Sequence, residues 1–217
     1  MHGFALNDIF KIGIGPSSSH TMGPMHAAQH FMSNLEQTLG NGSLKVSVTL
    51  HGSLAATGDG HGTPGAVTAG LVGHHYETVT LPDIESIWDT ATATGVMRSL
   101  SGHEIHFNPS HDLLRDMEPL ASHPNGMTFR AWAGDALIDE KQYFSVGGGM
   151  VEDQMGHTLA TSPLPEGDAP FPYKSMEELV LWCDREQLSI AQLQARNEHF
   201  CLKREEHDPI AAKLWSV

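Results

Sequence analysis

Hydrophobic and polar residues follow two different periods along this chain, and together they predict a mixture of strands and helices. Strict alternation over 44–50, Leu-Lys-Val-Ser-Val-Thr-Leu, predicts a half-buried strand. Similar patterns predict further strands at 104–107, 127–133 and 142–146. Apolar residues three or four positions apart predict helices at 4–12, 22–39, 64–73 and 84–100. We therefore expect an α+β fold, a mixed β-sheet covered by the helices at 22–39 and 64–73.

The pattern changes near residue 160. Four prolines fall between 161 and 172, which is typical of a linker or a domain boundary. Two capping boxes follow, Ser175 with Glu178 and Ser189 with Gln192, and each predicts the start of a helix. The expected organisation is thus a main domain at 1–160, a proline-rich linker at 161–174 and a helical segment at 175–217.

Composition removes several classes of function. The chain has 217 residues and a formal net charge of −14, the wrong sign for nucleic acid binding. Its two cysteines, Cys183 and Cys201, form no C-x-x-C pair, and the fifteen histidines show no strong ligand spacing, so we predict no metal site. No run is apolar enough to span a bilayer and no signal peptide is evident, which favours a cytoplasmic protein with no membrane partner.

One polar stretch, GIGPSSSHTMGP at Gly13–Pro24, has neither period. It is therefore predicted to be a loop, and it offers the hydroxyls of Ser17, Ser18, Ser19 and Thr21 beside His20. Such a loop at the N-terminus of a following helix can bind a carboxylate or a phosphate through hydroxyls and backbone N–H groups. The alternative interpretation is a solvated serine-rich linker with an ordinary N-cap.

A second glycine-rich turn, Gly58–Thr63, follows the strand at 44–50. Thr63 is expected to cap the next helix, with Pro64 at its first position. His61 lies between two glycines that allow close backbone approach, and imidazole titrates near neutral pH, so His61 and His20 are candidates for acid–base chemistry. Each can instead be a loop histidine with satisfied hydrogen bonds. We expect this turn and the serine loop to meet at one edge of the fold.

Five islands of sequence, in this order, resemble the N-terminal beta domain of the iron–sulfur L-serine dehydratases (L-serine ammonia-lyases). They are DIFKIGIGPSSSHTMGPMHAA from residue 8, GSLAATGDGHGT from 52, HPNGM from 123, YFSVGGG from 143 and PFPYKS from 170. The order matches the family and the islands reach across nearly the whole chain. Asp59 and Pro64 depart from the family pattern, which has a lysine and an aspartate at these positions.

The resemblance implies a fold similar to the allosteric serine-binding domain of phosphoglycerate dehydrogenase. It also implies conversion of L-serine to pyruvate and ammonia by a [4Fe–4S] cluster that a separate catalytic alpha region holds. This chain would then be the substrate-binding half of a lyase in amino-acid metabolism and gluconeogenesis. It would bind no cluster, be inactive alone, require the alpha region or subunit as its partner, and form a homo-oligomer.

Resemblance and residue chemistry together give a set of candidate site residues. The catalytic candidates are His61 and His20. The candidates for binding substrate are Ser17, Ser18, Ser19, Thr21, Gly62, Thr63, His123 and Asn125. For His123 and Asn125 a tight turn before a strand is an equally good interpretation, because Asn-Gly is a strong turn signal.

A second function remains open, that of a non-catalytic domain that senses L-serine and regulates a partner. A serine hydrolase that uses Ser19 and His20 is disfavoured, because adjacent loop residues seldom face each other and no G-x-S-x-G motif occurs.

Overall fold

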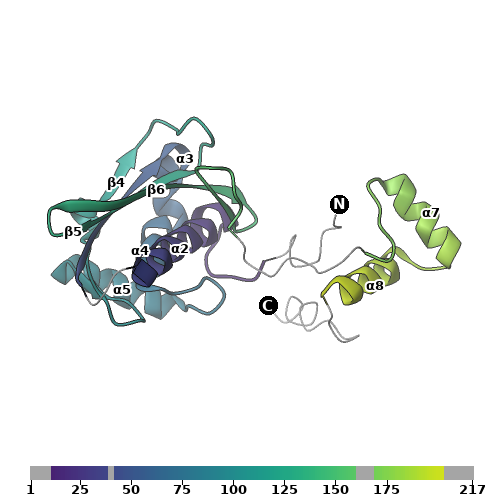
Figure 1. Ribbon diagram of the computed structural model, residues 1–217, viewed down its shortest axis with the longest axis horizontal. Coiled ribbons are helices and arrows are strands. Elements are labelled where there is room, and N and C mark those ends of the chain that lie inside the picture. Colours follow the sequence, from purple (N-terminus) through teal and green to yellow (C-terminus); the bar gives the residue numbers. More distant parts are fainter. Residues whose placement is uncertain (1–10, 39–41, 160–168, 203–217) are drawn as a thin grey trace. The chain divides into compact units, whose positions relative to one another are not determined.

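The computed structural model describes residues 11–38, 42–159 and 169–202. The chain divides into two compact units, one at Ile12–Leu159 and one that contains residues 169–202, and each is described by itself (Figure 1). The boundaries expected at 160 and 174 stay predictions. Most of the helix expected at 4–12, the helix end near 40 and the prolines at 163 and 165 lie outside the described residues.

A seven-stranded mixed sheet forms the frame of the larger unit, in the order β2-β3-β1-β5-β6-β7, with β4 also paired to β1. The central strand β1 pairs in parallel with β3 and β4 and antiparallel with β5. The strands are β1 Leu44–His51, β2 Val96–Arg98, β3 Glu104–His106, β4 Leu113–Asp116, β5 Gly126–Ala133, β6 Ala136–Gly147 and β7 Met150–Asp153. The α+β fold with a mixed sheet is therefore confirmed.

Helices α2 (Gly23–Thr38) and α4 (Thr63–Val72) cover one face of this sheet (Figure 1). Phe31 of α2 and Leu71 of α4 share a fully buried core with Val46 and Val48 of β1, because alternate residues of β1 point to the same face. Helix α5 (Leu81–Thr94) adds Ala91 to that core. The alternation thus identified the apolar face of β1, but the expected half-buried strand is wrong, because Ser47, Thr49 and His51 on the other face are buried too.

Several boundaries differ from the sequence-based expectation. The helix expected over 84–100 ends at Gly95, and Met97, which was expected inside it, is buried on strand β2 instead. Strands β4 and β7 and the short helices α3 (Gly52–Thr57) and α6 (Pro109–Asp112) were not predicted. Strand β4 has mostly exposed side chains and exists because its backbone pairs with β1, a cause that a local pattern does not record.

The serine-rich stretch is helical where a loop was expected. Ser18–Met22 forms a π-helical turn that continues directly into α2. Ser17 is its N-cap, with its hydroxyl oxygen accepting from the N–H of His20 at 3.2 Å. At the junction, a Cβ on Gly23 would lie 2.1 Å from Ser145 Oγ of β6, so only glycine fits this close approach of helix and sheet.

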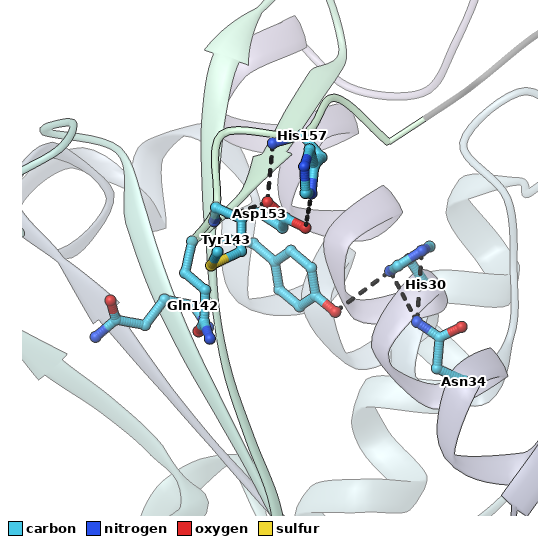
Figure 2. Close-up of polar contacts among 8 residues, drawn as sticks. His30, Asn34, Gln142, Tyr143, Asp153 and His157 are labelled. Carbon is cyan, nitrogen blue, oxygen red and sulfur yellow. Dashed lines mark hydrogen bonds and ion pairs between the residues drawn. The ribbon is translucent and has the colours of Figure 1, made fainter.

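Further along α2, a polar cluster attaches the helix to the β6–β7 edge of the sheet. Figure 2 shows the Tyr143 side chain of β6 pointing at His30 of α2, with 3.3 Å between the hydroxyl oxygen and His30 Nδ1. Asn34 lies one turn later and bonds to the same imidazole. Beside Tyr143, the carboxylate of Asp153 accepts from the N–H of His157 at 2.9 Å and fixes the turn after β7 (Figure 2).

The second unit is a pair of helices, α7 (Met176–Glu186) and α8 (Ile190–Leu202), which buries Leu179 and Leu193. Both predicted helix starts are confirmed, with backbone N–H groups donating to Ser175 Oγ and Ser189 Oγ. Cys183 lies on α7, and Cys201 falls within α8. No helix in the described ranges is long and apolar enough to cross a membrane.

Candidate functional site

The serine-rich turn and the glycine-rich turn meet, and two reciprocal hydrogen bonds join them. The buried hydroxyl of Thr21 donates to the carbonyl oxygen of His61 at 2.7 Å. In return, the buried hydroxyl of Thr63 donates to the carbonyl oxygen of His20. The expected cap role of Thr63 is wrong, because Gly62 is the N-cap of α4 and the Thr63 hydroxyl spans between the two turns instead.

This junction places the two histidine rings side by side. The centroids of His20 and His61 lie 4.8 Å apart with a tilt of 45°. Both residues are half-buried, as are Ser17, Ser18 and Ser19, so the cluster is sheltered and still reachable from solvent. The sequence suggested that the two turns would share one edge, and the structure brings them into direct contact.

The ring of His20 is bonded at both nitrogens. Its Nδ1 lies 3.0 Å from Ser19 Oγ and its Nε2 lies 3.1 Å from Ser53 Oγ. Burial lowers the pKa of His20 below its ordinary value; the neighbouring His61 lowers it further, and a hydrogen bond to the backbone of Ser53 works in the opposite direction. His20 is therefore held neutral at physiological pH.

Among the residues that the structure describes, the ring of His61 has a hydrogen-bond partner at one nitrogen. Its Nδ1 lies 2.9 Å from the carbonyl oxygen of Thr57, and because a carbonyl can only accept, Nδ1 carries a proton. In neutral His61 the lone pair is then on Nε2. On the same turn, Asp59 forms an ion pair of 2.5 Å with Arg115 of β4.

His123 and Asn125 lie in a turn directly before β5 and join the same region. The carbonyl of Pro124, between them, accepts the N–H of Ser53 at 3.0 Å. Asn125 exchanges bonds with Ser145: its side-chain amide donates to the Ser145 carbonyl at 3.2 Å, and its own carbonyl accepts the Ser145 N–H at 3.0 Å. His123 Nδ1 accepts the N–H of Asn125 at 3.1 Å, so its bonds in the structure are those of a tight turn.

The hydroxyls differ in what they have left to offer a ligand. Thr21 and Thr63 already donate to backbone carbonyls, and Ser17 accepts as an N-cap. Ser18 and Ser19 lie at the start of a helical run, where the first N–H groups lack intrahelical partners and the helix dipole is positive. The start of the run at Ser18 and Ser19 therefore favours an anion beside the two imidazoles, although the Ser19 hydroxyl also lies 3.0 Å from His20 Nδ1.

Ser53 is the residue that the sequence analysis did not assign to the site. It follows β1 and begins the unpredicted helix α3, and its hydroxyl faces His20 across 33 positions of sequence. The available signal was its place just after a strand end, where functional side chains often lie. Strand order alone did not indicate that His20 would be its neighbour.

Metal binding was tested on the donor set itself. Within residues 11–38, 42–159 and 169–202, no three histidine, cysteine, aspartate or glutamate side chains come together in a group that could hold a metal ion. A [4Fe–4S] cluster needs several thiolates, and Cys183 is the cysteine whose side chain is described. The described residues of this chain therefore do not fit such a cluster.

Comparison with known proteins decides the family. The family model of the serine dehydratase beta chain matches residues 5–156. The chain belongs to this family. It is 37% identical to L-serine dehydratase TdcG of Escherichia coli over 216 residues, and 39% identical to an L-serine dehydratase of Streptomyces coelicolor over 215 residues. A third relative, an L-serine dehydratase of Mycobacterium tuberculosis, is 41% identical over 217 residues.

These alignments cover nearly all of this chain but less than half of each relative. They include 97%, 97% and 95% of this chain but only 46%, 47% and 44% of the respective relatives. The chain therefore spans about half the length of the relatives that it matches.

Proposed function

We propose that this chain is the substrate-binding half of an L-serine dehydratase, which converts L-serine to pyruvate and ammonia together with a catalytic half that carries the [4Fe–4S] cluster. The observation that carries the proposal is the cluster of His20, His61 and the Ser17–Ser19 hydroxyls, built by the reciprocal bonds of Thr21 and Thr63. The family match supports the substrate, because the relatives are L-serine dehydratases.

The first task of this half is to hold the substrate carboxylate. The positive end of the run from Ser18 to Thr38, with the hydroxyls of Ser18 and Ser19, favours a negative charge and supplies directional donors. Because the turn is fixed by the Ser17 cap and by two bonds to the neighbouring turn, these donors are positioned before the substrate arrives.

The second task is to move a proton. Dehydration of serine removes the Cα proton and expels the β-hydroxyl, and the resulting aminoacrylate hydrolyses to pyruvate and ammonia. Hydroxide is a poor leaving group, and a [4Fe–4S] cluster held by the other half would supply the Lewis acid that its departure requires. In this half, the Nδ1 proton of neutral His61 is donated to Thr57, which leaves the lone pair on Nε2 without a hydrogen-bond partner among the described residues. We therefore assign the role of proton carrier to His61.

In this proposal the assembled enzyme works in the cytoplasm as a homo-oligomer. This chain alone binds no [4Fe–4S] cluster and has no deaminase activity. The test is reconstitution under anaerobic conditions with iron and the complementary half, followed by measurement of pyruvate formed from L-serine. Pyruvate is expected only when both halves are present.

A regulatory role gives a different result in that experiment. If a complex forms and L-serine binds this chain, yet the site variants leave pyruvate formation unchanged, then the chain senses serine and does not process it. If this chain alone is brown, contains stoichiometric iron and deaminates serine, then the division of labour proposed here is wrong.

A further inference from the structure

We propose that Ser53 is a positioning residue, whose hydroxyl holds the imidazole of His20 in place against His61. The inference rests on the proposed function, in which His20 and His61 are part of the serine site. It concerns the support behind that site, because Ser53 acts on the substrate only through the His20 ring.

The two hydrogen bonds of the His20 ring differ in where the partner residue lies: one partner is its neighbour in sequence, and the other belongs to a different element. Ser19, at Nδ1, is its neighbour in sequence and moves with it. Ser53, at Nε2, belongs to another element, the first turn of α3, and is the one side chain from outside the serine turn that bonds to this ring among the described residues. The orientation of the ring relative to the rest of the site therefore depends on Ser53.

Ser53 itself is held from several directions. Its N–H donates to the carbonyl of Pro124 at 3.0 Å. Gly52, just before it, has a φ of +53°, and a Cβ there would lie 2.6 Å from that same carbonyl, so glycine is required. His51 precedes them and ends β1, with its Nε2 2.9 Å from Thr128 Oγ1 of β5.

His51 also contacts a third strand, β4. His51 Nδ1 lies 3.5 Å from a carboxylate oxygen of Asp116, the last residue of β4. The segment from His51 to Ser53 is thus fixed to β4, to β5 and to the turn before β5. A hydroxyl mounted on so constrained a segment gives its partner a fixed reference point, which is what positioning of a catalytic ring requires.

The chemistry of a hydroxyl suits this task. It can donate or accept, so Ser53 can bond to either tautomer of His20, and with Ser19 at the opposite nitrogen a ring flip breaks two bonds. A hydroxyl brings no negative charge, so it stabilises a protonated His20 less than a carboxylate would. The ring is held in place, and in the proposed function the imidazole of His61 packed against it carries the proton.

The experiment has two readouts, and the first needs no activity. Ser53→Ala and Ser53→Thr are made in this chain, and the ring nitrogens of His20 are followed by long-range ¹H–¹⁵N NMR, with His20→Gln used for assignment. We expect one tautomer in the original chain, averaged ring signals in Ser53→Ala, and recovery in Ser53→Thr, which keeps the hydroxyl. Thr90→Ala, which removes a hydroxyl bonded within α5, is the matched control and should leave the signals unchanged.

The second readout is kinetic and uses the reconstituted enzyme. One lost neutral hydrogen bond of about 1 kcal/mol corresponds to about a five-fold loss, so Ser53→Ala should lower kcat about five-fold with little change in KM. Ser53→Thr should recover most of that loss. Should Ser53→Ala fail to fold, Ser53→Cys, whose thiol is only a weak donor, takes its place in both measurements.

The outcomes separate this inference from the proposed function. Unchanged His20 signals in Ser53→Ala overturn the inference, whatever the activity. Altered signals with an unchanged kcat in an active enzyme also overturn it, because the ring then needs no positioning for the reaction. Altered signals in a properly assembled complex that never deaminates serine support the role of Ser53 and refute the proposed function.

Discussion

Two histidines on one continuous helical run, His20 and His30, respond to burial in the same way and sit in very different surroundings. Burial is the largest cause that lowers the pKa of each. His20 has hydroxyls on both ring nitrogens and a second imidazole beside it. His30 faces the phenol of Tyr143, whose own pKa burial raises to about 12.

The difference shows that a lowered histidine pKa does not by itself identify a functional site. A phenol with a pKa of about 12 stays protonated near neutral pH, and we assign the contact between His30 and Tyr143 to the attachment of α2 to the sheet. At His20, the neighbouring group is a second imidazole, that of His61, whose ring centroid lies 4.8 Å away. The partner of a histidine, and its access to solvent, decide whether that histidine can take part in chemistry.

The largest effect should come from the histidine with a free nitrogen. His61→Ala in the reconstituted enzyme should lower kcat about a hundred-fold or more, because the proton carrier is lost. His30→Ala is the matched change in the histidine that faces Tyr143, outside the site. It should leave kcat within about two-fold and lower the melting temperature. Steady-state kinetics with L-serine measure both. Equal losses of kcat in the two variants would remove the distinction drawn here.

Next in size is the grip on the carboxylate. Ser18→Ala or Ser19→Ala should weaken serine binding about ten- to a hundred-fold, because a hydrogen bond to a charged group contributes about 1.5–3 kcal/mol. The effect should appear in KM and in the affinity for serine measured by calorimetry. Ser33→Ala on α2 is a control outside the site. Unchanged affinity with a lower melting temperature would return the turn to a purely structural role.

On the structural side of the comparison, Tyr143→Phe removes the hydroxyl that bonds His30 and keeps the ring in the core. The expected loss is about 1 kcal/mol in the free energy of unfolding, with no change in kinetics. Urea unfolding of this chain measures it. A change in kcat without a change in stability would show that the His30 cluster communicates with the site, contrary to the comparison.

The smallest effect concerns pH. The pKa of His30 is lower in the folded chain than in the unfolded chain, so the unfolded state binds protons more readily, and stability falls as pH drops through about 6.5. His20, His51 and His75 are lowered in the same direction. His30→Gln should therefore make the free energy of unfolding less dependent on pH between about 7.5 and 5. The exposed His111→Gln is the control, and an unchanged slope in His30→Gln would contradict this assignment.

Local rules in the sequence were sufficient for part of the fold. The alternation at 44–50 predicted strand β1 and the apolar face that packs on the helices, but it did not predict that the polar face is buried as well. The capping boxes at Ser175 and Ser189 predicted two helix starts, because a cap is an interaction between residues three positions apart. The resemblance of short motifs identified the family, which the comparison confirms.

Other features depended on contacts between distant segments. The serine stretch has no helical pattern, and it forms a π-helical turn whose residues bond to the turn at 61–63. The sequence suggested that this turn and His61 would meet. The reciprocal bonds of Thr21 and Thr63 arise from tertiary packing, and for this reason the sequence-based prediction that Thr63 caps a helix was wrong.

One physical reason separates the features that the sequence predicted from those that only the tertiary structure decided. Hydrophobic period, caps and glycine-rich turns act over a few residues, so the sequence alone determined which segments are strands and helices and which polar side chains are available for a site. The pairing of Ser53 with His20 joins positions 33 apart, and that of His30 with Tyr143 joins positions 113 apart. Only the folded sheet and the packing of α2 against it decided which histidine would face an imidazole and which a phenol.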